Sequence, residues 1–312
     1  VAWFSPGGAM FRGIFPPTVT LFKDDGAIDS EANRLHHDFL IESGVHGLFI
    51  LATTGEFMHM NLKEREQHAA ETVLHVNGRV PVIVGAGTTS TRETIRLGRH
   101  AQGVGANAVS IITPYFWTLS EREVVGHLSA VANAIDIPIL VYNFPAYSNH
   151  NISNETLLAL VREHRNIVGV IDAIDSLEHL RQRVQIVKTA NPDFRVLAGS
   201  DGHILNILQL GGDGTVPPTA NIAPRRHVEI LDAYLQRDYK RAVELLPGVL
   251  SCLDIFRITG SFHSVVKEAM AMAGSSAPST PRQPALPLTA ESRARLRDVL
   301  ARANLLPAAV EP

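Results

Sequence analysis

The chain has 312 residues, of which 45% are hydrophobic and 19% charged, so it can bury a large core and is not expected to be disordered. Its 28 basic and 31 acidic residues give a formal net charge of -3, which gives no support to a nucleic-acid or membrane-surface partner. A single cysteine, Cys252, lies in an apolar run and excludes a disulfide framework within the chain, as expected for a reducing cytoplasm.

The start of the chain carries no signal for export or for a membrane anchor. No stretch approaches the roughly 20 apolar residues of a membrane span. The first ten residues lack the basic start and the long apolar region of a signal peptide. Met10 is a candidate natural start, and residues 1–9 would then be an addition to the natural protein.

Apolar, β-rich runs recur about every 30 residues, the length of one βα unit. They are apolar throughout, as is typical of parallel strands buried on both faces. The expected strands are Gly13–Val19, Gly47–Leu51, Val80–Val84, Ala108–Ile112, Ile137–Tyr142, Ile167–Ile171, Phe194–Ala198 and Gly214–Val216. Eight such repeats predict an α/β protein with a (β/α)8 TIM barrel over residues 1–224. An open doubly wound sheet is the alternative, disfavoured by the count and by the lack of a G-x-G-x-x-G turn.

The helices between these strands are marked by their first residues. Ser90–Glu93 and Ser120–Glu123 fit the capping box, in which a hydroxyl and a glutamate satisfy unpaired amides reciprocally. Asn61–Glu64 and Asp175–Glu178 are close variants of that pattern. These four segments therefore predict helix starts that follow the second, third, fourth and sixth strands.

After residue 224 the pattern becomes helical only, which predicts that residues 225–312 form the last barrel helix and a C-terminal helical bundle. Pro247 is expected to kink or split one of these helices. A proline-rich stretch over residues 275–287 is expected to be a surface connection. The expected helices are Arg225–Gln236, Tyr239–Phe256, Ser264–Ala273 and Ala290–Ala303.

A barrel carries its chemistry at the C-terminal ends of its strands, so the residues that follow each strand are the candidates for a site. Thr53 and Thr54 precede Gly55 and offer hydroxyls and amides to a carboxylate or carbonyl oxygen. A capped turn that bonds its own backbone explains them equally well. Tyr142 and Tyr115 have phenolic hydroxyls that can relay protons, although the residues alone favour aromatic packing for both.

Other catalytic arrangements find less support. There are 14 histidines, but no strand end carries His-x-His, and His36 and His37 are adjacent in a helix and point in different directions. No metal is therefore expected. Ser200 and Asp201 have no convincing histidine partner in the sequence, which disfavours a Ser-His-Asp triad.

Two motifs together resemble one family. The segments 47–56 (GLFILATTGE) and 142–145 (YNFP) are similar to those of the dihydrodipicolinate synthase / N-acetylneuraminate lyase family of class I aldolases. The resemblance extends from about Gly13 to Leu300 and includes GGDGTVPPTANIAP and VVKEAM. YNFPA and IDSLEHLR are most similar to the 2-keto-3-deoxy sugar acid aldolases.

The resemblance implies a mechanism and a set of roles. In this family a lysine at the end of strand 6 forms a Schiff base with the keto carbon of pyruvate or another 2-oxo acid. Tyr142 would relay protons, Tyr115 is a second candidate that lies next to Phe116 in the sequence, and Thr53 and Thr54 would bind the carboxylate. No cofactor is implied. Further substrate contacts are expected at Gly55, Tyr147, Ser200 and Val216.

The sequence departs from the family at the central position. Where the family reads V-G-[IV]-K-[DE], residues 168–172 read VGVID, so Ile171 stands in place of the Schiff-base lysine. Only Lys23 among the five lysines is expected near the same rim, in a turn typical of solvent-exposed loops. Tyr147 replaces an arginine that helps to bind the aldehyde substrate in dihydrodipicolinate synthases. Phe116 replaces a tyrosine that reaches into a neighbouring subunit.

These departures leave three hypotheses. The first is a lyase that acts on a 2-oxo acid or a 2-keto-3-deoxy sugar acid and is impaired or altered by Ile171, or whose natural lysine was replaced. The second is a pseudoenzyme that binds a 2-oxo acid without catalysis. A metal-dependent aldolase on the same barrel is the least favoured. The resemblance also implies self-association as a homotetramer or a homodimer.

Overall fold

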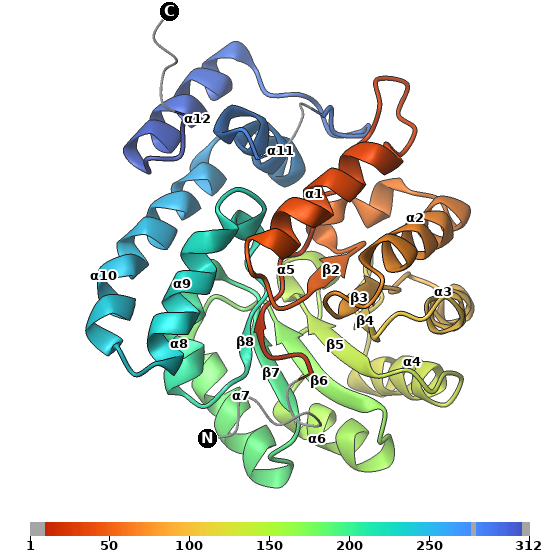
Figure 1. Ribbon diagram of the computed structural model, residues 1–312. Coiled ribbons are helices and arrows are strands. Elements are labelled where there is room, and N and C mark those ends of the chain that lie inside the picture. The colour runs from red at the N-terminus through yellow and green to blue at the C-terminus, as the bar shows by residue number, and fades with distance from the viewer. Residues whose placement is uncertain (1–9, 276–278, 308–312) are drawn as a thin grey trace, which may run out of the picture.

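The computed structural model describes residues 10–275 and 279–307. The proposed addition at residues 1–9 lies outside the described residues. The centre of the molecule is a parallel sheet of eight strands in the order β1-β8-β7-β6-β5-β4-β3-β2 (Figure 1). The strands are β1 (Gly13–Ile14), β2 (Leu48–Ile50), β3 (Val82–Gly85), β4 (Ala108–Ile112), β5 (Ile139–Asn143), β6 (Ile167–Asp172), β7 (Arg195–Ala198) and β8 (Gly214–Thr215).

The two ends of this sheet meet, because the chain beyond β1 runs alongside β2. The N–H of Thr18 donates to the Phe49 carbonyl at 2.9 Å, and the N–H of Phe49 donates to the Pro16 carbonyl at 3.0 Å. Pro16 and Pro17 have no N–H to donate, which explains why β1 is shorter than the sequence predicted. All eight predicted strands are confirmed, and the open doubly wound sheet is wrong.

Helices surround the sheet (Figure 1). They are α1 (Ser30–Glu42), α2 (Leu62–Val76), α3 (Thr91–Gly103), α4 (Glu121–Ala132), α5 (Pro145–Ser148), α6 (Asn154–Glu163), α7 (Leu177–Ala190) and α8 (Ile204–Gln209). Asn61 and Ser120 form complete capping boxes, and Ser90 accepts the N–H of Glu93. The prediction that Asp175 caps α7 is wrong: Ser176 is the cap and accepts the N–H of His179.

Four helices follow β8 in the described part of the chain: α9 (Pro224–Leu235), α10 (Tyr239–Leu250), α11 (Phe262–Ala273) and α12 (Ala290–Arg302). The helix predicted over Tyr239–Phe256 ends early. Pro247 lies inside α10, and the chain continues from it as the 3-10 helix η5 (Ser251–Arg257). Proline cannot donate to the preceding turn, which agrees with this early end.

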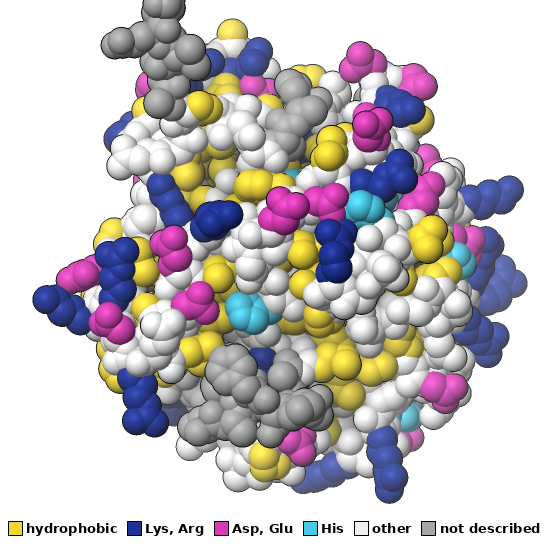
Figure 2. Space-filling model, in the orientation of Figure 1, with side chains coloured by type: hydrophobic (Ala, Val, Ile, Leu, Met, Phe, Trp, Pro, Cys, Tyr) yellow, Lys and Arg dark blue, Asp and Glu magenta, His cyan; other side chains and the backbone are white. Residues whose placement is uncertain are grey.

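The core has two parts. The larger one fills the barrel and the layer beneath its helices, whereas the smaller one joins α11 and α12 to Val19 and Leu21. Helices α11 and α12 therefore pack against the segment that follows β1. The division at residue 224 stays a prediction. On the surface, basic and acidic side chains are interspersed (Figure 2). No helix in the described ranges is both long and apolar enough to cross a membrane.

Candidate active site

The predicted carboxylate-binding turn is the 3-10 helix η1 (Thr53–Gly55), shortly after β2. Thr53 and Thr54 are both buried. The Thr20 hydroxyl donates to the Gly55 carbonyl at 2.8 Å and fixes the turn from the side of β1. A Cβ on Gly55 would lie 2.9 Å from the Thr18 carbonyl oxygen, so this place needs glycine.

Some backbone amides of the turn are hydrogen-bonded within it, and others can bind a ligand. The N–H of Gly55 donates to the Ala52 carbonyl, and the N–H of Glu56 donates to the Thr53 carbonyl. Both of these amides are used inside the turn. The hydroxyls and amides of Thr53 and Thr54 are therefore the donors that the turn can offer to a ligand.

Tyr142 reaches this turn across the barrel. Its hydroxyl lies 3.5 Å from the Thr53 hydroxyl, and its ring lies edge-on to Phe49 of β2, with 5.8 Å between the ring centroids. Because β5 and β2 are three strands apart, these contacts show that the side chain points into the barrel. Burial raises the pKa of Tyr142 well above its ordinary value, so the phenol stays protonated at neutral pH.

Ile171 lies beside Tyr142. The two residues are register partners on β5 and β6, and partners on adjacent parallel strands face the same side of a sheet. Asp172, the next residue, faces outward and binds Arg183 at 2.9 Å and His179 at 2.8 Å, both on α7. Ile171 therefore points into the barrel, where it has no exposed surface.

All five lysines lie within the described residues, and the contacts found for them do not involve Ile171 or Tyr142. Lys188 pairs with Asp213 at 2.6 Å, and Lys267 pairs with Glu56 at 2.5 Å. Asp213 precedes β8, so Lys188 lies at the opposite end of the barrel. The remaining lysines are exposed on the surface: Lys23, Lys63 and Lys240.

The other predicted residues are more dispersed. Tyr115 is half-buried and lies edge-on to Phe57 at 5.9 Å, and burial raises its pKa. Tyr147 is 53% exposed, and the Phe144 ring lies between it and Tyr142, with its centroid 4.6 Å from that of Tyr147 and 5.6 Å from that of Tyr142.

Ser200 and Val216 follow β7 and β8, as the sequence predicted. Ser200 is half-buried and Val216 is buried, and no direct contact of either with the Thr53–Gly55 turn is found among the described residues. The structure thus brings together Thr53, Tyr142 and Ile171. It leaves the other candidates around them.

Asp201 has a histidine partner that the sequence did not reveal. His227 of α9 lies 3.1 Å from its carboxylate, and the Thr219 hydroxyl contacts both residues. All three are almost fully buried, and Ser200 is not among these contacts. The group therefore fixes α9 and the segment after β8 to the end of β7, and it is not a Ser-His-Asp triad.

Metal binding finds no support in the described ranges. Within residues 10–275 and 279–307, no group of three or more histidine, cysteine, aspartate or glutamate side chains is arranged to hold an ion. His36 is instead within 3.0 Å of Asn221, and burial lowers its pKa to about 4. Cys252 is buried, which raises its pKa to about 11 and fits a structural thiol.

The model of the dihydrodipicolinate synthetase family matches residues 10–303. The chain belongs to the dihydrodipicolinate synthetase family. Its relatives include the putative 2-dehydro-3-deoxy-D-gluconate aldolase YagE of Escherichia coli K12, which is 37% identical over 96% of this chain and 99% of YagE. The probable 2-dehydro-3-deoxy-D-pentonate aldolase YjhH of the same organism is 37% identical over 95% of this chain and 99% of YjhH.

Solved structures agree with this membership. The crystal structure of YagE in complex with pyruvate has a TM-score of 0.93 at 37% identity and covers 95% of this chain and all of that one. A dihydrodipicolinate synthase from Thermotoga maritima has a TM-score of 0.89 at 32% identity, over 95% of this chain and 100% of the other. The fold is therefore the TIM barrel of this lyase family.

Two features of the site were missed by sequence reasoning. Glu56 directly follows the turn and is paired with Lys267, a residue that the sequence placed only in the C-terminal helices. The backbone N–H of Arg282 also donates to Glu56, from 226 positions away. No local pattern signals such a contact, since it joins segments that meet only in the folded chain.

Proposed function

We propose that this chain binds the carboxylate of a 2-oxo acid or a 2-keto-3-deoxy sugar acid at Thr53 and Thr54, with Tyr142 as the proton relay. The observation that carries this proposal is the 3.5 Å approach of the Tyr142 and Thr53 hydroxyls across the barrel. The names of YagE and YjhH, and the pyruvate in the YagE structure, support this class of ligand. Gly55, Tyr147, Ser200 and Val216 are the proposed further contacts.

The second part of the proposal concerns the chemistry. We infer that Ile171 occupies the place of the Schiff-base lysine. Its side chain has no amine to attack a keto carbon, so the covalent imine that withdraws electrons during cleavage cannot form there. Any cleavage, condensation or dehydration would proceed through an enolate held by hydroxyl and amide donors. The resulting activity is that of an impaired or altered lyase.

A non-catalytic binding protein is the second candidate. It is favoured by the full burial of Ile171 and by the ion pairs that hold Lys188 and Lys267. In this case the turn and Tyr142 would still bind a 2-oxo acid, but no bond of the ligand would break.

Pyruvate and borohydride test whether an imine forms at all. Borohydride reduces an imine to a stable amine, which intact mass spectrometry detects as an added mass. We expect no adduct on the natural chain and one adduct on Ile171→Lys, mapped to the introduced lysine. Ile171→Met is the control, because it fills similar volume without an amine. An adduct on any lysine of the natural chain would refute the non-covalent mechanism.

Cleavage of a 2-keto-3-deoxy sugar acid then separates a lyase from a binding protein. Slow release of pyruvate by the natural chain, accelerated in Ile171→Lys, supports the impaired lyase. Pyruvate binding without any release supports the non-catalytic protein. If neither binding nor release is detected, the proposed ligand class is wrong.

We also propose that the protein self-associates, as a homotetramer or a homodimer, through the loop after β4. Phe116 is 83% exposed with a φ of 108°, a backbone conformation that is rare for a bulky residue, and Trp117 is 60% exposed. Exposed aromatic pairs of this kind favour burial at an interface. Sedimentation velocity of the natural chain and of Phe116→Ser tests this, and a smaller species is expected for the variant.

A further inference from the structure

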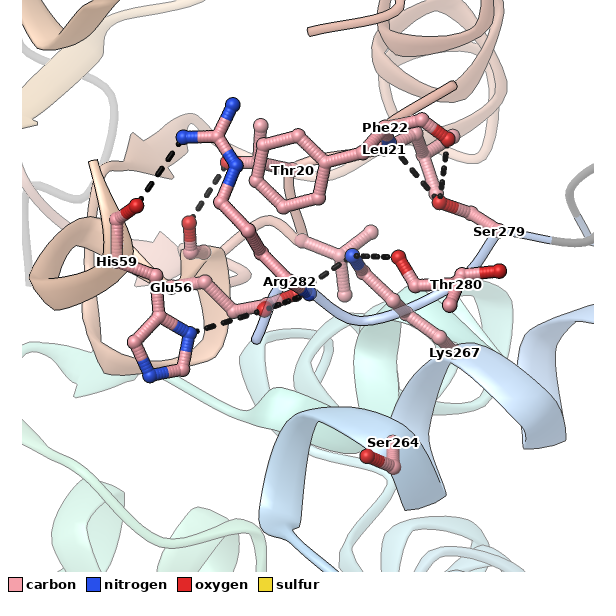
Figure 3. A network of polar contacts seen from close by, with 12 residues as sticks. Thr20, Leu21, Phe22, Glu56, His59, Ser264, Lys267, Ser279, Thr280 and Arg282 are labelled. Atoms are coloured by element: carbon pink, nitrogen blue, oxygen red, sulfur yellow. Dashed lines mark hydrogen bonds and ion pairs between the residues drawn. The ribbon is translucent and has the colours of Figure 1, made fainter. Parts of the chain in front are cut away.

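The loop after β2 is joined to α11 and to residues 279–282 by a buried polar network to which the proposed chemistry assigns no role (Figure 3). Its centre is Glu56, whose carboxylate has no exposed surface. One carboxylate oxygen lies 2.5 Å from the Lys267 ammonium on α11. The other accepts the backbone N–H of Arg282 at 2.9 Å and lies 3.3 Å from His59.

Three groups around Lys267 attract positive charge, whereas burial, with Arg282 nearby, lowers the pKa of its ammonium. Its Nζ lies 4.3 Å from the centre of the Phe22 ring and 3.4 Å from the Thr280 carbonyl, in addition to its contact with Glu56. The aromatic face, the carbonyl and the carboxylate all attract positive charge. These contacts direct the Lys267 amine toward Glu56 and occupy it there. We therefore do not expect Lys267 to replace the lysine that is absent from position 171.

The backbone of Glu56 explains why the turn needs such a hold. Glu56 has a φ of 57°, the left-handed region, and lies between η1 and the 3-10 helix η2 (Phe57–His59). A residue with a side chain keeps this conformation only when its surroundings impose it. Apart from His59 of η2, the groups that hold the Glu56 carboxylate come from α11 and from the segment 279–282.

We propose that Lys267 is a positioning residue, which holds Thr53 and Thr54, through Glu56, in the geometry that binds the carboxylate of the ligand. This inference rests on the proposed function. It adds that the affinity of the site depends on α11 and on residues 279–282, although neither lies within the barrel. Loss of the ammonium would leave the Glu56 carboxylate buried without its cation, and the turn would rearrange to bring it toward water.

A second lysine provides a matched control for this proposal. Lys188 pairs with Asp213 at 2.6 Å at the other end of the barrel. Lys267→Met and Lys188→Met remove the same group and keep a similar volume. The double variant Glu56→Gln/Lys267→Met removes both charges and avoids an unpaired buried carboxylate, so it remains a fair test if Lys267→Met fails to fold.

Two measurements on the full chain test the proposal. Amide hydrogen exchange at Gly55 and Glu56, without ligand, reports the order of the turn, because both amides are bonded inside it. Calorimetric titration with pyruvate reports the site. For Lys267→Met, and for the double variant, we expect faster exchange at these amides and an affinity for pyruvate about tenfold weaker. For Lys188→Met we expect neither change.

Each outcome decides the question. Unchanged exchange in Lys267→Met and in the double variant would overturn the positioning role, and so would faster exchange with unchanged pyruvate affinity. Equal effects in Lys188→Met would reduce Lys267 to a general contribution to stability. If the natural chain does not bind pyruvate while exchange rises only at the turn of the Lys267 variants, the assigned ligand is wrong and the hold of Lys267 on the turn stands.

Discussion

Two buried carboxylates lie at opposite ends of the barrel, and each is paired with a lysine. Glu56 follows β2 and binds Lys267, whereas Asp213 precedes β8 and binds Lys188 at 2.6 Å, with Arg12 at 3.0 Å. In TIM barrels the C-terminal ends of the strands carry the chemistry, and the opposite ends serve stability. The same kind of ion pair should therefore control ligand affinity at one end and only folding at the other.

The surroundings of the two carboxylates agree with this division. Asp213 also lies 3.3 Å from Arg195 and accepts the backbone N–H of Val196, so it joins the starts of three neighbouring strands. Glu56 instead joins a left-handed turn to a helix and a loop far along the chain. The first arrangement joins strands that already neighbour one another in the sheet, and the second joins a turn to segments outside the sheet.

The largest effect is expected from Asp213→Asn. The substitution leaves Arg12, Lys188 and Arg195 without their shared carboxylate, and breaking a buried pair in this way costs roughly 3–5 kcal/mol. Urea denaturation measures the free energy of unfolding. The dissociation constant for pyruvate should stay unchanged in the folded variant, so a marked loss of affinity would show that the two ends of the barrel are not separable.

A smaller effect is expected from the histidines between α1 and α2, which belong to neither end. Burial lowers the pKa of His68 to about 4, and burial, with His68 nearby, lowers the pKa of His37 well below its ordinary value. These imidazoles are neutral in the folded protein and become protonated on unfolding below pH ~6.5. The free energy of unfolding is therefore not reduced by these histidines above pH ~6.5, and it decreases as the pH falls toward 4.

His68→Leu should remove part of this acid sensitivity. From the two pKa values, His68 accounts for a loss of about 2 kcal/mol between pH 7 and pH 5. Urea denaturation at both pH values should show that the free energy of unfolding changes by about 2 kcal/mol less in the variant than in the unaltered protein. His100→Leu, which changes a half-buried histidine on α3, is the control. An unchanged pH dependence in His68→Leu would mean that His68 is already protonated in the folded protein.

Comparison of these regions also shows what a sequence can reveal. All eight strands could be predicted from their apolar runs, because a strand that is buried on both faces is apolar throughout. The proximity of Thr53 and Tyr142 could be predicted, because strand ends meet at one rim of a barrel. The pairs Glu56–Lys267 and Asp201–His227 were not found, because their partners come from helices whose position depends on the finished fold.

The predicted N-cap of α7 was wrong for a related reason. Asp175 and Ser176 are both good N-cap residues, and the sequence pattern placed the start one residue early. Asp175 and Ser176 have similar preferences for the N-cap position, so the sequence alone could not decide between them. In the structure, Asp175 contacts His203 of the segment after β7 at 2.8 Å, and Ser176 is the cap.

The smallest effect on stability is expected from Tyr142→Phe, and it is the one that separates folding from function at the candidate site. Within residues 10–275 and 279–307, the one hydrogen bond found for this hydroxyl is the 3.5 Å approach to Thr53, which is too long for a strong bond. The free energy of unfolding should therefore change by less than about 1 kcal/mol, well below the change in Asp213→Asn. In an Ile171→Lys background, however, Tyr142→Phe should slow the borohydride-trapped reaction with pyruvate about a hundredfold if this phenol relays the proton. Equal trapping rates with and without the hydroxyl would remove Tyr142 from the mechanism and leave it as a packing residue against Phe49.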